Sequence, residues 1–418
     1  MKASPYSKSN GKCWACKSKT SEILKIENLP LTGRFPKKDE DYLTGDIGFS
    51  VCGNCKLIMI DQAYSPDDLY SEYYYRTAIN NTMRKHISNL IIHCINKYGK
   101  EKQGNWLDIG CNDGYTVSIA KAIGWEVTGV DPSNVIGSYF NNLYSNEKTK
   151  ARFINDIYPP QSDEIRDKFQ IISTISMFYD IHQIENFVNS IDNHLADDGI
   201  WVIEMNYTKD MLLKNGYDMI SHEHITYYTL SSFIKILGII NKDFKVFDVL
   251  YTPINGGSIS IFVDKGKRPT SKNVDELCKE EEKVGLNSVD KIKSYFKDIQ
   301  EHSKEVNNFF NKLKQQKKKI SIYGASTRGN TNILLSELDH NVISYAYEKN
   351  PDKFGRYCPG TDILIKDEKS LLKDMPDYLI VMPYSFINEF LIKESKYLEM
   401  GGKMVTLVPE IKIYESNI

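Results

Sequence analysis

The feature that most constrains the fold is a buried strand that ends in a glycine turn and leads into a helix. Residues 107–109 have the pattern of a buried strand, residues 110–114 form the turn, and residues 115–123 are predicted to be helical. Glycines in such a turn let backbone amides approach a ligand at the carboxyl edge of a parallel sheet. The run therefore predicts an α/β domain with a binding site at that edge.

Short β-rich runs alternate with helical stretches in two parts of the chain, which indicates βαβ units and parallel sheets. The candidate strands are residues 106–109, 126–130 and 169–173, and then 319–324, 342–347, 378–382 and 403–408. The charged stretch 271–319 is predicted to form one or two exposed helices. We therefore expect an α/β protein with a small domain at 1–70, a Rossmann-like domain at 71–265 and a second, smaller Rossmann-like domain at 266–418.

The charge balance indicates neither nucleic acid nor a membrane as a partner. The 418 residues include 53 Lys and Arg against 55 Asp and Glu, a formal net charge of −2 at pH 7. No apolar run approaches the roughly 20 residues that span a bilayer, and the N-terminal residues lack the apolar core of a signal peptide. We expect a cytoplasmic protein, either a monomer or a small homo-oligomer.

Four of the eight cysteines form two CxxC pairs, Cys13 with Cys16 and Cys52 with Cys55. Each pair places two thiolates on one side of a turn, and two such turns complete a closed tetrahedral Zn²⁺ site. The gap of 35 residues is longer than the roughly 15–20 of a simple zinc ribbon, which indicates a β-rich insertion. We predict a structural zinc; unrelated core cysteines and a redox pair are the alternatives.

Acidic residues around the glycine turn indicate a cofactor. Asp131 ends the next predicted strand, where a carboxylate can accept hydrogen bonds from both ribose hydroxyls. Asp108 in the first strand is typical of methyltransferases and is usually absent from nicotinamide-binding proteins. We predict S-adenosyl-L-methionine (SAM), with a nicotinamide cofactor or an empty glycine turn as alternatives. The cofactor-binding candidates in this region are Asp108, Gly110, Asn112, Gly114 and Asp131.

Asp156 follows a further candidate strand at the same edge of the predicted sheet. Its carboxylate is positioned to contact the adenine amino group. A helix cap or a solvated loop carboxylate is an equally good interpretation.

The densest cluster of titratable side chains is His222-Glu223-His224, which follows the predicted strand 199–205. Two imidazoles flanking a carboxylate can supply a general base and its orienting partner. Carbon methylation needs such a base, because a carbon beside a ketone must lose a proton before it attacks a sulfonium methyl group. A polar structural loop is the main alternative; a metalloprotease HExxH motif would need another spacing.

Aromatic and imidazole side chains near the same edge are further candidates. Tyr179 and His182 follow a predicted strand, so they are expected either in the site or packed in the core. Tyr227 and Tyr228 follow the histidine cluster and could donate to a substrate oxygen or simply pack.

Several motifs in this order resemble the nucleotide-sugar C-methyltransferases of deoxysugar biosynthesis, and the resemblance covers nearly the whole chain. One is the four-cysteine set. The others are residues 73–77 with 80–83, 108–114, 222–228, 255–258 (Asn-Gly-Gly-Ser) and 323–330 (Tyr-Gly-Ala-Ser-Thr-Arg-Gly-Asn). In that family a zinc-binding domain precedes a SAM-binding domain and a C-terminal Rossmann-like domain.

The resemblance implies a reaction and roles for the matched residues. A nucleoside-diphosphate 4-keto-6-deoxysugar would lose its C3 proton to a base, and the resulting carbanion would take the methyl group of SAM. His224 would be the base, with Glu223 and His222 supporting it, and Tyr75 and Thr77 would cover the cofactor. The family tends to carry Tyr before His-Glu-His, whereas this chain has Ser221.

The C-terminal domain is predicted to bind the nucleotide of the substrate. Residues 324–330 are predicted to open a helix, whose amide groups together with Arg328 would form a binding site for a diphosphate. Ser326, Arg328 and Asn330, together with Tyr227 and Asn255, are therefore the substrate-binding candidates. A purely structural domain is the main alternative.

Three other functions remain open from the sequence. An O- or N-methyltransferase acting on a sugar or small metabolite would need no carbon-acid base. An RNA methyltransferase would need a basic stripe, which the charge pattern does not show. A non-catalytic binding protein would not need an intact His-Glu-His.

Overall fold

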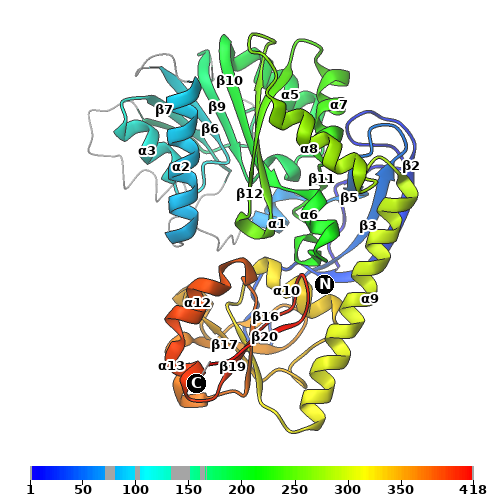
Figure 1. Ribbon diagram of the computed structural model, residues 1–418, viewed down its shortest axis with the longest axis vertical. Helices are drawn as coiled ribbons and strands as arrows, with labels where there is room; N and C mark the ends of the chain where they lie inside the picture. The colour runs from blue at the N-terminus through cyan, green and yellow to red at the C-terminus, as the bar shows by residue number, and fades with distance from the viewer. Residues whose placement is uncertain are drawn as a thin grey trace.

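The computed structural model describes residues 2–70, 81–98, 104–132, 151–160, 165 and 167–416. In this part of the chain, no helix is long and apolar enough to cross a membrane. Figure 1 shows a large upper lobe, an N-terminal sheet at its side and a lower lobe that contains the C-terminus.

A seven-stranded sheet forms the centre of the upper lobe. Its order is β12-β13-β10-β9-β6-β7-β8, parallel from β10 to β8, with β13 antiparallel to both of its neighbours. The strands are β6 (Asn105–Ile109), β7 (Glu126–Val130), β8 (Ala151–Ile154), β9 (Phe169–Ile175), β10 (Leu195–Asn206), β12 (Lys245–Thr252) and β13 (Ser258–Asp264). Because β6, β7, β8, β9 and β10 are parallel, their carboxyl ends meet at one edge of the sheet.

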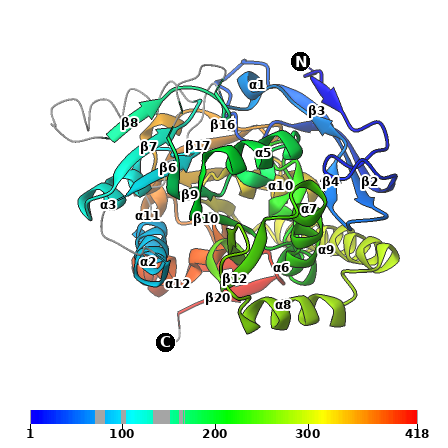
Figure 2. The same ribbon diagram turned by 90° about the horizontal axis from the view of Figure 1, so that it is seen from above.

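Amphipathic helices cover both faces of this sheet (Figure 2). Helices α2 (Asn81–Tyr98) and α3 (Tyr115–Ala122) lie on one face, and α5 (Ile184–His194) and α7 (Leu230–Ile240) on the other. The buried positions of α5 are Ile184, Phe187, Val188 and Ile191, the i, i+3, i+4, i+7 spacing of a single apolar face. The Rossmann-like α/β architecture predicted from the sequence is confirmed.

The N-terminal sheet is antiparallel and includes a strand from the middle of the chain. Its order is β11-β4-β3-β2. The strands are β2 (Thr20–Pro30), β3 (Thr44–Cys52), β4 (Ile58–Ile60) and β11 (Thr226–Tyr227). Nearby, β1 (Ser7–Lys8) pairs with β5 (Gln62–Ala63), and α1 (Pro66–Tyr70) follows. The pairing of β11 with β4 joins the predicted segments 1–70 and 71–265 by backbone hydrogen bonds.

The charged stretch after residue 271 forms two helices, as predicted, but the second is not merely exposed. These are α8 (Lys272–Lys283) and α9 (Val289–Gln315), and α6 (Thr208–Leu213) precedes them in the chain. Helix α9 runs along one side of the molecule from the upper lobe to the lower lobe (Figure 1). It buries Phe296 against Phe49 of the N-terminal sheet and Phe310 in the core of the lower lobe.

The lower lobe contains a second, mostly parallel sheet of order β16-β17-β15-β14-β18-β19-β20. The strands are β14 (Ile320–Tyr323), β15 (Tyr345–Glu348), β16 (Tyr357–Cys358), β17 (Ile363–Asp367), β18 (Tyr378–Val381), β19 (Lys403–Thr406) and β20 (Lys412–Tyr414). Its helices are α10 (Thr327–Leu335), α11 (Leu371–Asp374), α12 (Ile387–Lys393) and α13 (Ser395–Glu399). The strand predicted at 342–347 begins only at Tyr345, because the amides of Val342 and Ile343 bond to the Asp339 carbonyl in a turn.

Glu281 of α8 stabilises the start of α7. The carboxylate is 1% exposed and accepts hydrogen bonds from the Leu230 amide (2.6 Å), the Ser231 amide (2.9 Å) and the Tyr207 hydroxyl (2.8 Å). It therefore satisfies helix-terminal N–H groups that would otherwise be buried without partners.

We expect Glu281→Ala to lower the local stability of α7 by about 3 kcal/mol, because several buried donors lose their acceptor at once. Hydrogen–deuterium exchange of the Leu230 and Ser231 amides measures this opening free energy. Glu282→Ala at the exposed neighbouring position is the control and should change it by less than about 0.5 kcal/mol. Equal exchange in the two variants would contradict the assignment.

Candidate functional site

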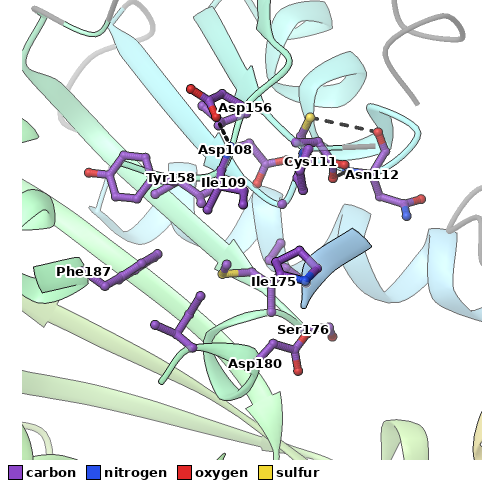
Figure 3. A pocket seen from close by; sticks show the side chains of 18 of the residues that line it. Asp108, Ile109, Cys111, Asn112, Asp156, Tyr158, Ile175, Ser176, Asp180 and Phe187 are labelled. Atoms are coloured by element: carbon purple, nitrogen blue, oxygen red, sulfur yellow. Dashed lines mark hydrogen bonds between the residues drawn. The ribbon is translucent and has the colours of Figure 1, made fainter. Parts of the chain in front are cut away.

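A cavity of about 510 Å³ lies at the carboxyl edge of the upper sheet. Its wall includes the glycine turn after β6, the residues that follow β7, β8 and β9, and two residues of α2. Figure 3 shows Asp108, Cys111 and Asp156 on one side of this space and Ile175, Ser176 and Asp180 on the other. We call this space the edge cavity.

The glycine turn has the backbone geometry that its sequence predicts. Gly110 (φ 72°), Asn112 (φ 48°) and Gly114 (φ 76°) all lie in the left-handed region, which favours glycine and tolerates asparagine. A Cβ at Gly110 would lie 3.0 Å from Cγ of Met177, so a side chain here would crowd the opposite wall. Gly114 is the N-cap of α3 and is not part of the cavity wall.

Two carboxylates expected near the cofactor line the edge cavity. Oδ2 of Asp131 accepts a hydrogen bond from the Asn112 amide at 3.0 Å, which holds the carboxylate beside the turn. Asp108 accepts from the Ser173 hydroxyl at 2.6 Å, and burial raises the pKa of its carboxyl to about 7. Asp131 is thus bonded to the turn itself, whereas Asp108 is bonded to the neighbouring strand β9.

The other cofactor candidates have different positions. Asp156 lines the cavity, and its Oδ1 accepts from the Ile157 amide at 2.7 Å, so it is also a local turn acceptor. Tyr75 and Thr77 lie outside the described residues.

His182 lines the edge cavity, whereas Tyr179 lies behind its wall. The Nε2 atom of His182 is 3.0 Å from the Tyr6 hydroxyl, and its ring contacts Trp14 edge-on. The Tyr179 ring packs edge-on against His224 with centroids 4.6 Å apart. The two expected site residues of this loop therefore face different spaces.

His224 is held as a neutral imidazole. Its Nδ1 lies 2.7 Å from the Met219 carbonyl, which requires the proton on Nδ1 and leaves Nε2 as an acceptor. Burial lowers the pKa of His224 to about 4. The residue lines a small void with Tyr179 and Tyr227, and the next residue in the chain, Ile225, lines the edge cavity.

Glu223 and His222 do not orient His224, contrary to the geometry expected from the sequence. His222 directs Nε2 to the Gly45 carbonyl at 3.1 Å and packs edge-on against Tyr64. Glu223 points toward Gly33, where an added Cβ would lie 2.7 Å from its Oε1. The physical reason is that residues 221–225, here called the histidine loop, are irregular, so adjacent side chains point in different directions.

The burial of Glu223 has an electrostatic consequence. Desolvation raises the pKa of its carboxyl to about 7. Its surroundings include the methyl group of Thr327, at the start of α10 in the lower lobe. The histidine loop therefore contacts the N-terminal segment and lies close to the start of α10 in the lower lobe.

The predicted substrate-binding residues all have partners within the protein. Arg328 donates to Oδ2 of Asp218 (2.9 Å from Nε) and to the Asn255 carbonyl (3.0 Å). The other three bond as follows: the Ser326 hydroxyl accepts from the Gly329 amide, Asn330 Nδ2 donates to the Thr32 carbonyl, and the Tyr227 hydroxyl donates to the Met219 carbonyl. Arg328 thus joins the lower lobe to the segment just before the histidine loop.

Sequence reasoning missed two sets of residues. Asp218 is buried and pairs with Arg328 across the lobes, a contact between residues 110 positions apart that no local pattern reveals. N-terminal residues also line the edge cavity, namely Tyr6, Tyr64, Pro66 and Leu69. The Pro-containing start of α1 is a local signal for a helix but not for its place in a cavity wall.

The four cysteines of the two CxxC pairs come together as predicted. Their Sγ atoms all lie within 4.8 Å of one another, and the Cys16–Cys52 and Cys13–Cys55 pairs are 3.4 and 3.6 Å apart. Tetrahedral Zn–S bonds of about 2.3 Å place sulfurs about 3.8 Å apart, so the set fits Zn²⁺ closely. Four thiolates leave no open coordination position.

Comparison with known proteins agrees with this arrangement. A family model described as a methyltransferase domain matches residues 83–241, and one described as a C-methyltransferase C-terminal domain matches residues 253–409. The C-methyltransferase NovU of Streptomyces niveus is 24% identical over 408 residues, which are 95% of this chain and 94% of that protein.

Solved structures give weaker similarity. The PH0226 protein of Pyrococcus horikoshii OT3 has 14% identity over 48% of this chain and 96% of that chain, with a TM-score of 0.38. A SAM-dependent methyltransferase of Clostridium acetobutylicum ATCC 824 has 16% identity over 44% of this chain and 92% of that chain, with a TM-score of 0.36. Because the two family models follow one another along most of the sequence and NovU matches nearly the whole chain, the protein is a SAM-dependent methyltransferase.

Proposed function

We propose that this enzyme methylates a carbon atom beside the ketone of a nucleoside-diphosphate keto-deoxysugar. The observation that carries the proposal is the neutral His224, whose Nε2 is free to accept a proton one residue away from the wall of the edge cavity. An O- or N-methyltransferase would need no such base. A cavity suited to the cofactor together with a buried imidazole base therefore favours a carbon atom as the methyl acceptor.

The edge cavity is the proposed site of SAM. The backbone of residues 110–113 would lie against the cofactor, Asp131 would accept from the ribose hydroxyls, and Asp156 would lie near the adenine. Bound there, SAM supplies an electrophilic methyl group. The residues of the chain would align the methyl group of SAM with the acceptor carbon. Such alignment accounts for a large part of the rate enhancement of a bimolecular displacement.

His224 is the proposed general base, and its surroundings explain how it works. The Met219 carbonyl fixes the proton on Nδ1, so Nε2 is the atom that removes hydrogen from the carbon acid. As the proton leaves, negative charge develops on the ketone oxygen and needs a nearby donor. We propose Tyr179 for this role, because its ring contacts the imidazole of His224.

The lower lobe is proposed to bind the nucleotide of the acceptor. Arg328 and the start of α10 face the histidine loop, so a diphosphate bound there would place its sugar near His224. We propose domain limits of 1–70, 71–265 and 266–418 for the metal-binding, cofactor-binding and acceptor-binding parts. The cysteine set is proposed to hold one structural zinc ion.

Replacing Asp131 tests the cofactor site. We expect Asp131→Ala to weaken binding of S-adenosylhomocysteine (SAH) more than tenfold, because two hydrogen bonds to a charged acceptor are lost. Isothermal titration calorimetry measures this directly. Asp156→Ala is the comparison, since its carboxylate also serves a local turn and should have a smaller effect. Unchanged affinity in Asp131→Ala would exclude the proposed orientation of the cofactor.

Replacing His224 tests the chemistry apart from cofactor binding. Without SAM but with SAH, the wild-type enzyme should exchange the proton beside the ketone of a nucleoside-diphosphate 4-keto-6-deoxysugar with deuterium from the solvent. His224→Asn should slow this exchange by about 100-fold or more while SAH still binds. Deuterium incorporation is measured by mass spectrometry. Exchange at the wild-type rate in the variant would remove His224 from the mechanism, and none in the wild type would favour O-methylation.

Metal removal tests the cysteine site. We expect one zinc ion per chain, and its removal by a chelator should lower the melting temperature, because a closed four-thiolate site contributes folding free energy. Elemental analysis and differential scanning fluorimetry measure the two quantities. Cys52→Ser should reproduce the effect, whereas Cys358→Ser, at a buried cysteine of the lower lobe, should leave the zinc content unchanged. A metal-free protein with unchanged melting temperature would contradict a structural zinc.

A further inference from the structure

A partly buried imidazole, His86, and a buried carboxylate, Glu204, form a pair near the edge cavity without lining it. Nε2 of His86 on α2 is 2.8 Å from Oε2 of Glu204 on β10, and the Ser260 hydroxyl donates to the same oxygen at 2.8 Å. Glu204 is 1% exposed, and its Oε1 has no hydrogen-bond partner among the described residues. Neither residue has a place in the mechanism described above.

Glu204 supports one wall of the edge cavity through its backbone. Its carbonyl accepts a hydrogen bond from the Ser176 amide at 2.9 Å. Ser176 has a φ of 57°, a left-handed conformation that costs free energy for a residue with a side chain and persists only where neighbours hold it. Ser176 lines the cavity on the side opposite the glycine turn (Figure 3).

His86 supports another wall through its helix. Met83 and Ile87, which flank His86 on α2, both line the cavity. The same helix contacts the glycine-turn side through Ser88, whose hydroxyl is 3.1 Å from that of Tyr115. The position of α2 relative to β10 therefore sets the width of the cavity.

We propose that His86 and Glu204 are positioning residues for the cofactor: their contact fixes α2 and Ser176 at the spacing that SAM requires. The inference rests on the proposed placement of SAM in the edge cavity. A buried ion pair is a weak source of stability compared with well-packed apolar residues. The hydrogen bond between His86 and Glu204 nevertheless requires a particular distance and direction. It therefore fixes the separation of α2 and β10 more narrowly than apolar contact does.

The test compares SAH affinity in folded variants of the full chain. His86→Leu removes the donor and should raise the Kd for SAH by about tenfold or more, measured by calorimetry. His86→Gln keeps an N–H donor for Glu204 and should stay within about threefold of wild type. Lys85→Gln, at the exposed neighbouring position of α2, should bind SAH as the wild type does.

A second control separates positioning from general destabilisation. Tyr397→Phe removes a buried hydrogen bond to the Pro376 carbonyl in the lower lobe, far from α2 in the chain, and lowers stability without touching the cavity. A His86→Leu variant that binds SAH with wild-type affinity would overturn the proposal. So would an equal loss of affinity in Tyr397→Phe.

SAH affinity in two further variants, Glu204→Gln and Asp131→Ala, completes the test. If His86→Leu does not fold, Glu204→Gln replaces it; this variant keeps the shape, removes the charge and should weaken SAH binding about threefold or more. Wild-type SAH affinity in Glu204→Gln would then overturn the proposal. If Asp131→Ala retains SAH affinity, the placement of SAM in the edge cavity is itself wrong. If Asp131→Ala loses SAH affinity while the His86 and Glu204 variants keep it, only the positioning role is refuted.

Discussion

The short backbone pairing of β11 with β4 is the contact on which the arrangement of the site depends. Thr226 pairs with Met59 and Tyr227 with Ile58, and the Ile60 amide bonds to the Ile225 carbonyl. These few hydrogen bonds fix the histidine loop, which has no regular structure of its own, to a sheet built around the cysteine set. The loop can therefore hold a neutral imidazole in one tautomer beside the edge cavity.

Much of the fold could be predicted from the sequence, because its signals are local and periodic. Three features were predicted from spacings within short stretches of sequence. These are the glycine turn at 110–114, the two CxxC pairs and the alternation of strands with helices. The second Rossmann-like sheet follows for the same reason. The start of β15 was misplaced, since apolar residues at 342–343 satisfy a strand pattern while their amides close a turn.

The contacts of the candidate site could not be predicted from the sequence. His222, Glu223 and His224 are adjacent in sequence, so mutual support was the natural hypothesis. Yet His222 bonds to the Gly45 carbonyl, His224 bonds to the Met219 carbonyl, and Glu223 points toward Gly33. Neighbouring side chains in an irregular loop have no fixed periodicity, unlike those of a helix or strand. The pairing of Arg328 with Asp218 could not be predicted either, because a contact between lobes joins residues that are far apart in the sequence and share no local pattern.

The contact between Arg328 and Asp218 also bears on how such enzymes could be recombined. A chimera that exchanges only residues after 265 would pair a new arginine with an old carboxylate and an old Asn255 carbonyl. Asn330 would likewise meet the Thr32 carbonyl of the original N-terminal segment. The contacts of the lower lobe are thus shared among three chain regions, and a transplanted lower lobe keeps them only if the 217–225 and 30–36 segments travel with it.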